Sequence, residues 1–146
     1  MSLESLRKLR AQEVERLMME LAQITRTLTQ NEERCRDIEA QIQKDVVLYD
    51  RQSAQGLTIE VWLEWQGRID SQQAALRRVR DEIDQAVETW QHTQTLLIEA
   101  SQERRLLDRV ADKRREAQRA EEGRQEQRTT DEAASRRYSV GKASHS

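Results

Sequence analysis

The 146-residue sequence contains no proline, no phenylalanine and only four glycines. Proline and glycine are the residues that most often end regular structure, so their scarcity favours long, uninterrupted helices. Aromatic residues make up 3% of the chain and charged residues 36%, and a broad globular core is therefore not expected. The apolar residues are mostly Leu, Ile, Val and Ala, which favour a narrow packed seam between helices.

The charges show no excess of one sign, because 25 basic and 27 acidic residues give a formal net charge of −2. Such a balance does not favour nucleic acid or anionic lipid as a partner. The single cysteine, Cys35, cannot form an internal disulfide, and no N-terminal apolar segment resembles a signal peptide or a membrane span. We therefore expect a cytoplasmic protein without direct membrane insertion.

Apolar residues recur in alternating steps of three and four along the first third of the chain, which is the heptad spacing of a coiled coil. Asn31 and Asp45 fall on the same seam, where a polar residue lowers stability but fixes the register of pairing. Arg7 and Arg10 occupy the seam near the start, so the first turns are expected to pack loosely. The apolar seam positions are Val14, Leu17, Leu21, Ile24, Leu28, Cys35, Ile38 and Ile42.

The segment 53–57 interrupts this pattern with Gly56, and Thr58 then offers a helix-capping hydroxyl. A second heptad pattern follows the interruption. A short loop between two heptad helices places them antiparallel, each burying the apolar stripe of the other. In the second heptad pattern, one seam position recurs as Trp62, Ile69, Leu76, Ile83, Trp90 and Leu97. The other recurs as Trp65, Gln72, Val79, Ala86, Thr93, Ala100 and Leu107.

We predict an all-α fold, a two-helix antiparallel coiled-coil hairpin with a longer C-terminal helix. The first helix covers residues 1–52, the bend 53–57, the second helix 58–137, and a disordered tail 138–146. If pairing is centred on the bend, Leu3 lies opposite about Leu106, and the second helix has no partner within the chain from Leu107 onwards. Past Val110 the charges alternate in sign with alanine as the apolar filler, which is typical of a solvated helix held by local ion pairs.

A two-stranded coil offers no concave site, so we expect no enzymatic activity, no metal and no cofactor. His92 and His145 have no nearby nucleophile in a recognisable arrangement, and Cys35 is better explained as a small seam residue than as a metal ligand. The arginines of residues 104–119 are interleaved with acidic residues that would repel phosphates, so nucleic acid is not an expected partner.

The three tryptophans are nearly all of the large aromatic content. For Trp90, packing in the seam is favoured over contact with a partner. For Trp62 and Trp65 the two roles are about evenly balanced, because aromatic residues at the exposed end of a coil are common binding anchors.

Two segments, GLTIEVWLEWQGRI at residues 56–69 and QEQRTTDEAASRR at residues 125–137, resemble the FliJ family of flagellar export proteins and its virulence-secretion counterparts of the YscO and HrpO type. The resemblance implies a non-enzymatic two-helix stalk of a bacterial type III protein export apparatus, flagellar or injectisome. It implies contact with the hexameric export ATPase and with the export-gate membrane protein, and for some members with substrate chaperones. The location that it implies is peripheral to the inner-membrane apparatus, on the cytoplasmic side.

The resemblance also suggests where each partner binds, although the reverse assignment of the two ends stays open. A purely structural coiled-coil dimer and a chaperone-like binder of secreted subunits are the alternative functions. The candidate ATPase-binding residues are Leu107, Arg109, Asp131, Glu132, Arg136 and Arg137, and the candidate gate-binding residues are Trp62, Trp65, Ile69 and Gln72.

Overall fold

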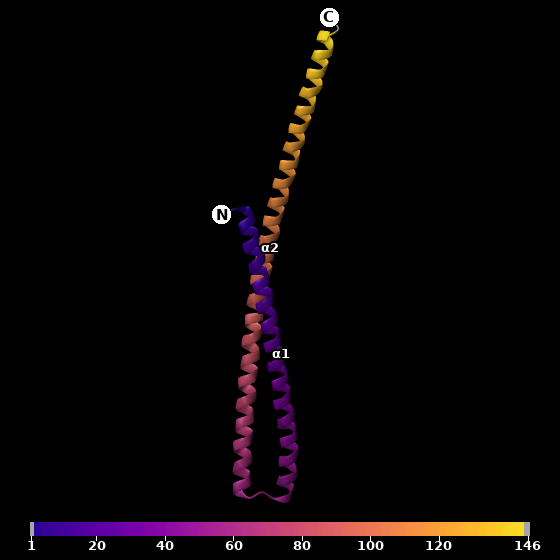
Figure 1. The fold of residues 1–146 in the computed structure, drawn as a ribbon. Coiled ribbons are helices and arrows are strands. Elements are labelled where there is room, and N and C mark those ends of the chain that lie inside the picture. Colours follow the sequence, from indigo (N-terminus) through magenta and orange to yellow (C-terminus); the bar gives the residue numbers. More distant parts are fainter. Residues whose placement is uncertain (1, 145–146) are drawn as a thin grey trace. The chain divides into compact units, whose positions relative to one another are not determined.

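The computed structural model describes residues 2–144, which form two long helices joined by a short loop (Figure 1). Helix α1 spans Leu3–Gln55, which is 53 residues, and helix α2 spans Ile59–Ser144, which is 86 residues. Residues 2–144 contain no strand, so the predicted all-α class is confirmed.

The loop consists of residues 56–58 and is formed by local backbone chemistry. Gly56 has a φ of 94°, a left-handed conformation that glycine adopts without steric penalty, and its N–H donates to the Ser53 carbonyl at 3.1 Å. The Thr58 hydroxyl then accepts a hydrogen bond from the Val61 N–H at 3.3 Å, as a helix N-cap does. Helix α1 therefore runs past residue 52, its expected last residue, because the conformation that ends it lies at Gly56.

Helix α2 continues beyond Arg137, its expected last residue. The stretch 138–144 contains no proline, and Gly141 does not take the positive φ that ends a helix at Gly56. The helix therefore runs on to Ser144, and the prediction of a disordered tail is wrong for residues 138–144. Residues 145 and 146 of that predicted tail lie outside the described residues.

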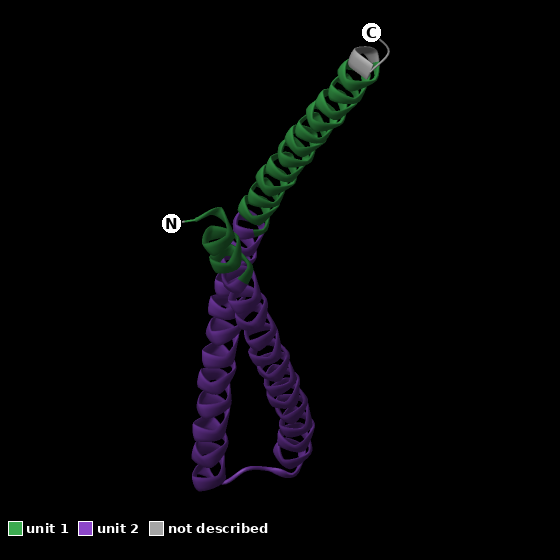
Figure 2. Cartoon of the chain, turned by 45° about the horizontal axis from the view of Figure 1, so that its top comes forward, with its two compact units in different colours: residues 1–11, 101–146 green, residues 12–100 purple. Residues whose placement is uncertain are grey.

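The chain divides into two compact units (Figure 2). Unit 1 comprises Met1–Ala11 and Ser101–Ser146, and unit 2 comprises Gln12–Ala100. Each unit contains a stretch of α1 and a stretch of α2.

In unit 2 the two helices bury a narrow seam between them. Leu17 and Val79 are almost completely buried, with 1% and 2% of their surface exposed. Leu17 packs with Val14, Ala100 and Leu97. The buried α2 residues of unit 2 fall on one predicted heptad position, which is why they share a face of the helix. These residues are Trp65, Val79, Thr93 and Ala100.

Side-chain contacts across this seam connect low residue numbers of α1 with high residue numbers of α2, and the reverse. Where the number rises along α1, the number of the contacting residue falls along α2. The contacts are Thr25 with Trp90 at 3.2 Å, Arg34 with Glu82 at 3.6 Å, Glu39 with Arg80 at 3.3 Å, Asp45 with Arg68 at 2.9 Å, and Gln52 with Trp65 at 2.8 Å.

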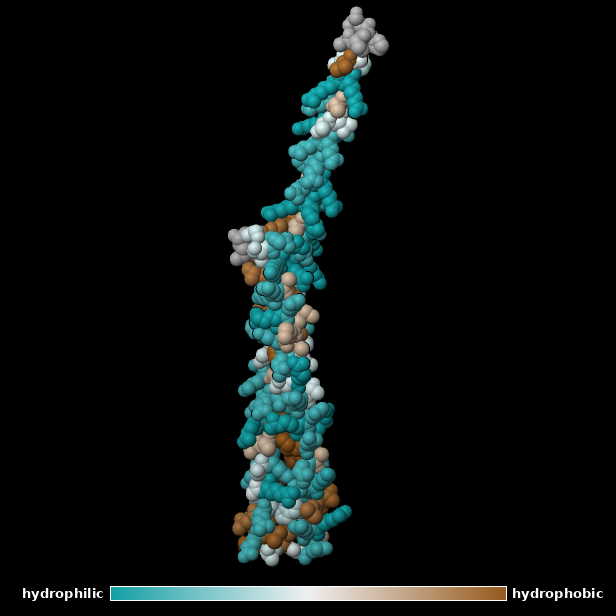
Figure 3. All heavy atoms as spheres, viewed as in Figure 1, coloured by the Kyte–Doolittle hydropathy of each residue, from teal (hydrophilic) through white to brown (hydrophobic). Residues whose placement is uncertain are grey.

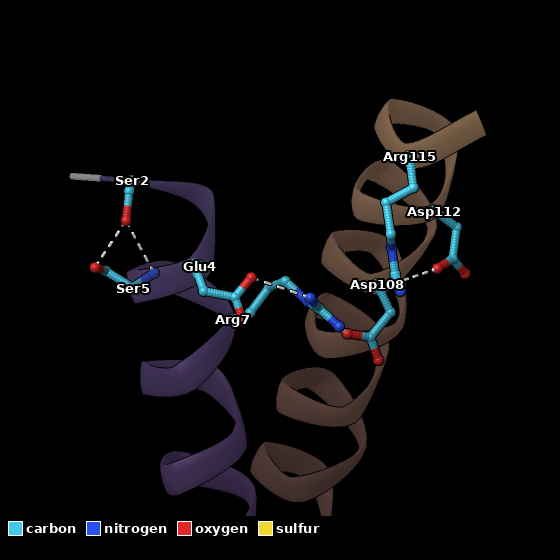
Figure 4. A network of polar contacts seen from close by, with 7 residues as sticks. All are labelled: Ser2, Glu4, Ser5, Arg7, Asp108, Asp112 and Arg115. Carbon is cyan, nitrogen blue, oxygen red and sulfur yellow. Dashed lines mark hydrogen bonds and ion pairs between the residues drawn. The ribbon is translucent and has the colours of Figure 1, made fainter. Parts of the chain in front are cut away.

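In unit 1 the first turns of α1 contact α2 through ion pairs, of which Figure 4 shows the one between Arg7 and Asp108. Arg7 Nε lies 3.1 Å from the Asp108 carboxylate, and Arg10 Nε lies 3.0 Å from the Glu103 carboxylate. The hydrogen bond to Asp108, together with the charge of Glu4, raises the pKa of Arg7 above its ordinary value. The two arginines thus occupy the seam, as the sequence predicted, and their charges are matched by acidic residues of α2.

The pairing in unit 1 extends further along α2 than the sequence suggested. Arg7 contacts Asp108, and Ala111 is buried at 6% exposure, so the partner of Leu3 is not near Leu106. The expected position was wrong because α1 ends at Gln55, which moves the centre of pairing into residues 56–58. The unpaired part of α2 accordingly begins at Asp112, and Leu107 is half-buried within the paired part.

Candidate functional site

The first candidate surface is the stretch Asp112–Val140 of α2, called the exposed helix below. Every residue in it is exposed, and Figure 3 shows it as an almost wholly hydrophilic surface. Its side chains pair locally, with Arg115 2.8 Å from Asp112 and Arg124 3.2 Å from Glu121. Pairs of this kind stabilise a single helix by about 0.2–0.5 kcal/mol each, so the helix forms while its surface stays available to a partner.

The candidate ATPase-binding residues do not all lie in the same surroundings. Asp131, Glu132, Arg136 and Arg137 lie in the exposed helix, and Arg109 is exposed just before it. Leu107 is half-buried on the seam, so only part of its side chain is open to a partner. The assignment of these six residues to the ATPase stays a prediction.

The second candidate surface is the loop end of unit 2, residues 42–73, called the tip below. Hydrophobic residues gather here on the outside of the molecule, as the brown surface at the loop end shows in Figure 3. Exposed apolar patches on a soluble protein commonly mark binding sites for other proteins. The exposed apolar residues of the tip are Val46, Val47, Leu48, Ile59, Trp62 and Leu63.

The two tryptophans of the tip have different roles. Trp65 is 5% exposed, its Nε1 donates to Gln52 at 2.8 Å, and its ring meets the Tyr49 ring edge-on with 5.7 Å between centroids. Arg68 adds a guanidinium 5.2 Å from the centroid of the Trp65 ring. Trp62 is 44% exposed, although it fell on a predicted seam position. Trp65 is thus a packing residue, and Trp62 is the ring that a partner can reach.

Two hollows adjoin Trp65. The smaller, of about 170 Å³, is lined by Trp65, Ile69 and Gln72 together with residues of α1, so the structure brings three of the four candidate gate-binding residues to one place. The larger and more open one, of about 530 Å³, lies against the bend and also includes Trp65. Trp62 lines neither hollow.

The sequence placed Asp45 on the seam but did not identify the side chains that bind its carboxylate. Arg68 Nη2 donates to Asp45 Oδ1 at 2.9 Å, Gln41 Nε2 donates to the same oxygen at 3.2 Å, and Gln72 Nε2 donates to Oδ2. No buried polar side-chain atom in the described part of the chain lacks a hydrogen-bond partner. The sequence feature that could have identified these partners is a basic residue next to the seam of α2, opposite an acidic residue on the seam of α1.

Residues 2–144 offer neither a metal site nor a membrane-spanning helix. No group of three or more His, Cys, Asp or Glu side chains is arranged to hold a metal ion there. No helix of this part of the chain combines the length and the apolar character that crossing a membrane requires. Cys35 is a half-buried free thiol on the seam. His92 is exposed, and Trp90 is half-buried.

The chain thus consists of two long helices, with a heptad seam, a charged exposed helix and an apolar tip. The chain belongs to the FliJ family, because the family model described as "Flagellar FliJ protein" matches residues 1–143. Searches of curated proteins and of solved structures gave no significant match. Family membership confirms the resemblance to FliJ and places the chain among the structural components of flagellar type III protein export.

Proposed function

We propose that this protein is a non-enzymatic stalk of the type III export apparatus that binds the hexameric export ATPase and links it to the export-gate membrane protein. It acts on the cytoplasmic side, peripheral to the inner-membrane apparatus. The observation that carries the proposal is the uninterrupted exposure of residues 112–140 on a helix that elsewhere packs against α1. A helix that is exposed over this length gains no stability from packing against the rest of the chain. Its exposure therefore favours a role in binding a partner.

The proposal includes an antiparallel coiled-coil hairpin. Its support is the series of contacts from Thr25 with Trp90 to Gln52 with Trp65, in which numbers rise along α1 and fall along α2. A loop of residues 56–58 is too short to connect parallel helices of this length.

The exposed helix is the proposed ATPase-binding surface. It has no apolar face, so burial against a second copy or a lipid surface would bring little hydrophobic stabilisation. Charges of both signs fit polar recognition by another protein, and a preformed helix binds with a smaller loss of conformational entropy than a disordered segment. Asp131, Glu132, Arg136 and Arg137 are the proposed contacts near its C-terminal end, with Arg109 as an exposed contact near its beginning.

The tip is the proposed surface for the export gate. Tryptophan is among the residues whose truncation most often weakens a protein interface, and Trp62 presents such a ring beside the exposed Ile59 and Leu63. Ile69 and Gln72 contribute to the smaller hollow rather than to the outer patch.

Two variants test both surfaces at once, each serving as the control for the other. The first replaces Asp131, Glu132, Arg136 and Arg137 by Ala, which removes two charges of each sign and leaves the net charge unchanged. The second is Trp62→Ala. Calorimetric titrations of the purified export ATPase and of the cytoplasmic domain of the gate protein give the affinities.

We expect the fourfold variant to lose ATPase affinity about tenfold while binding the gate domain normally, and Trp62→Ala to show the opposite pattern. An exchanged pattern would reverse the assignment of the two surfaces. Wild-type affinity of both variants for both partners would contradict the proposed function.

A further inference from the structure

Asp45 is the buried charged residue of the described part of the chain, with 6% of its side chain exposed. It lies on the seam of α1 and is bound by side chains from both helices. Arg68 and Gln72 reach it from α2 and Gln41 from α1. Because both carboxylate oxygens have donors, the charge is held in one place despite its low exposure.

Arg68 connects this carboxylate to Trp65. Its Nη2 lies 2.9 Å from Asp45 Oδ1, while its guanidinium carbon lies 5.2 Å from the centre of the Trp65 ring. The Arg68 side chain is 49% exposed, so without the carboxylate it would be free to turn towards water. The ion pair therefore keeps the cation over the indole, where the two attract each other.

Trp65 in turn forms part of the wall of both hollows of the tip. Its Nε1 donates to Gln52, its ring forms a T-shaped contact with Tyr49, and Arg68 lies over its face. A change in the orientation of this one ring would alter the shape of both hollows.

We propose that Asp45 is a positioning residue, which holds the Trp65 indole through Arg68 and thereby sets the shape of the tip surface that receives its partner. The functional part of this inference rests on the proposed contact between the tip and the export gate. The effect of Asp45 on the indole can be measured without any partner.

A positioning role and a merely stabilising role predict different outcomes. A polar residue on a coiled-coil seam usually lowers stability, and the half-exposed Arg68 side chain can be hydrated once its partner is removed, so no buried charge is left unpaired. Asp45→Leu should therefore keep or raise the melting temperature while it releases Arg68. Asn31→Leu is the matched control, since Asn31 is also a buried polar seam residue, at 8% exposure, but lies outside the tip.

The experiment uses the full chain and records the three indole N–H resonances, with Trp65→Phe identifying the signal of Trp65. We expect the Trp65 resonance to shift in Asp45→Leu and in Asp45→Asn, while the Trp90 resonance stays in place. Affinity for the cytoplasmic domain of the gate protein should fall about tenfold at an unchanged or higher melting temperature. Asn31→Leu should change neither the Trp65 resonance nor the affinity. Asp45→Asn nearly preserves side-chain volume, so it carries the test if the leucine variant folds poorly.

An unmoved Trp65 resonance in both Asp45 variants would overturn the proposal. So would wild-type affinity of the variants, or a loss of affinity that only follows a loss of helicity. If the wild-type chain itself does not bind the gate domain, the proposed function of the tip fails, and the indole resonance alone decides whether Asp45 positions Trp65.

Discussion

Helix α2 has one stretch that packs against α1 and another that is exposed to solvent. Comparing the two shows which residues stabilise the fold and which are available for binding. Within unit 2 its apolar residues recur at heptad positions, and Val79 and Ala100 are buried against α1. In the exposed helix, residues 112–140, charged residues are dense and no residue is buried. Both stretches are helical, but only the first gains stability from packing. The placement of apolar residues, rather than helix propensity, decides which part of α2 forms the fold.

The largest effect is expected from a charge in the seam. Leu17→Asp places a carboxylate at a position with 1% exposure and should lower the free energy of unfolding by about 3–5 kcal/mol. Met19→Asp, at 73% exposure two residues further along, should change it by less than about 0.5 kcal/mol. Leu21→Asp, at a half-buried seam position, should fall between them. Thermal melts followed by circular dichroism measure all three, and equal melts for Leu17→Asp and Met19→Asp would contradict the seam.

A smaller effect is expected at the bend. Gly56→Ala puts a side chain where φ is 94° and should cost about 1–2 kcal/mol, because L-residues are strained in the left-handed region. Gly67→Ala is its control, since an added Cβ there meets no atom within 4 Å and the residue is helical. That change should stabilise the protein by about 0.5–1 kcal/mol. Chemical denaturation should show opposite signs for the two variants, and the same sign would argue against the loop geometry.

A local effect is expected at Gly123, in the middle of the exposed helix. Gly123→Ala should raise helix stability there by about 0.8–1 kcal/mol, because glycine is a poor helix former and the added Cβ meets nothing within 4 Å. Amide hydrogen exchange should slow within residues 112–140, while the main melting transition keeps its midpoint. A rise of that midpoint would mean that the exposed helix unfolds together with the paired helices.

The smallest effect on stability is expected from the fourfold Ala variant at Asp131, Glu132, Arg136 and Arg137. Exposed substitutions of this kind usually change the free energy of unfolding by less than about 0.5 kcal/mol. The far-ultraviolet circular dichroism signal should stay almost unchanged. A clear loss of helicity would assign this segment to folding rather than to binding.

The seam could be predicted from the sequence because it is periodic. Positions such as Leu17, Val79 and Ala100, and even the polar Asn31 and Asp45, follow from heptad spacing and are buried. The all-helical class followed from the absence of proline and the scarcity of glycine.

Features that depend on how one helix is offset against the other could not be predicted in this way. Because Arg7 pairs with Asp108, the unpaired part of α2 begins later than the sequence suggested. The partners of Asp45 depend on the same offset of α1 against α2. Heptad spacing also assigned both Trp62 and Trp65 to the seam, whereas only Trp65 is buried. Near the bend there is no further turn to continue the packing, so periodicity alone does not show which ring turns inwards.

The most direct test of the proposed function is the ATP hydrolysis rate of the cognate export ATPase, measured with and without this chain, with oligomeric state read by light scattering in the same samples. A chain ending at Ala111 is the matched control, because it lacks the exposed helix but keeps all the residues that are buried in the described part of the chain. We predict faster hydrolysis and a more populated hexamer with the full chain, and neither with the shortened one. No change with the full chain, and a dimeric state of the chain itself, would contradict the ATPase assignment and favour a structural or chaperone-like coiled coil.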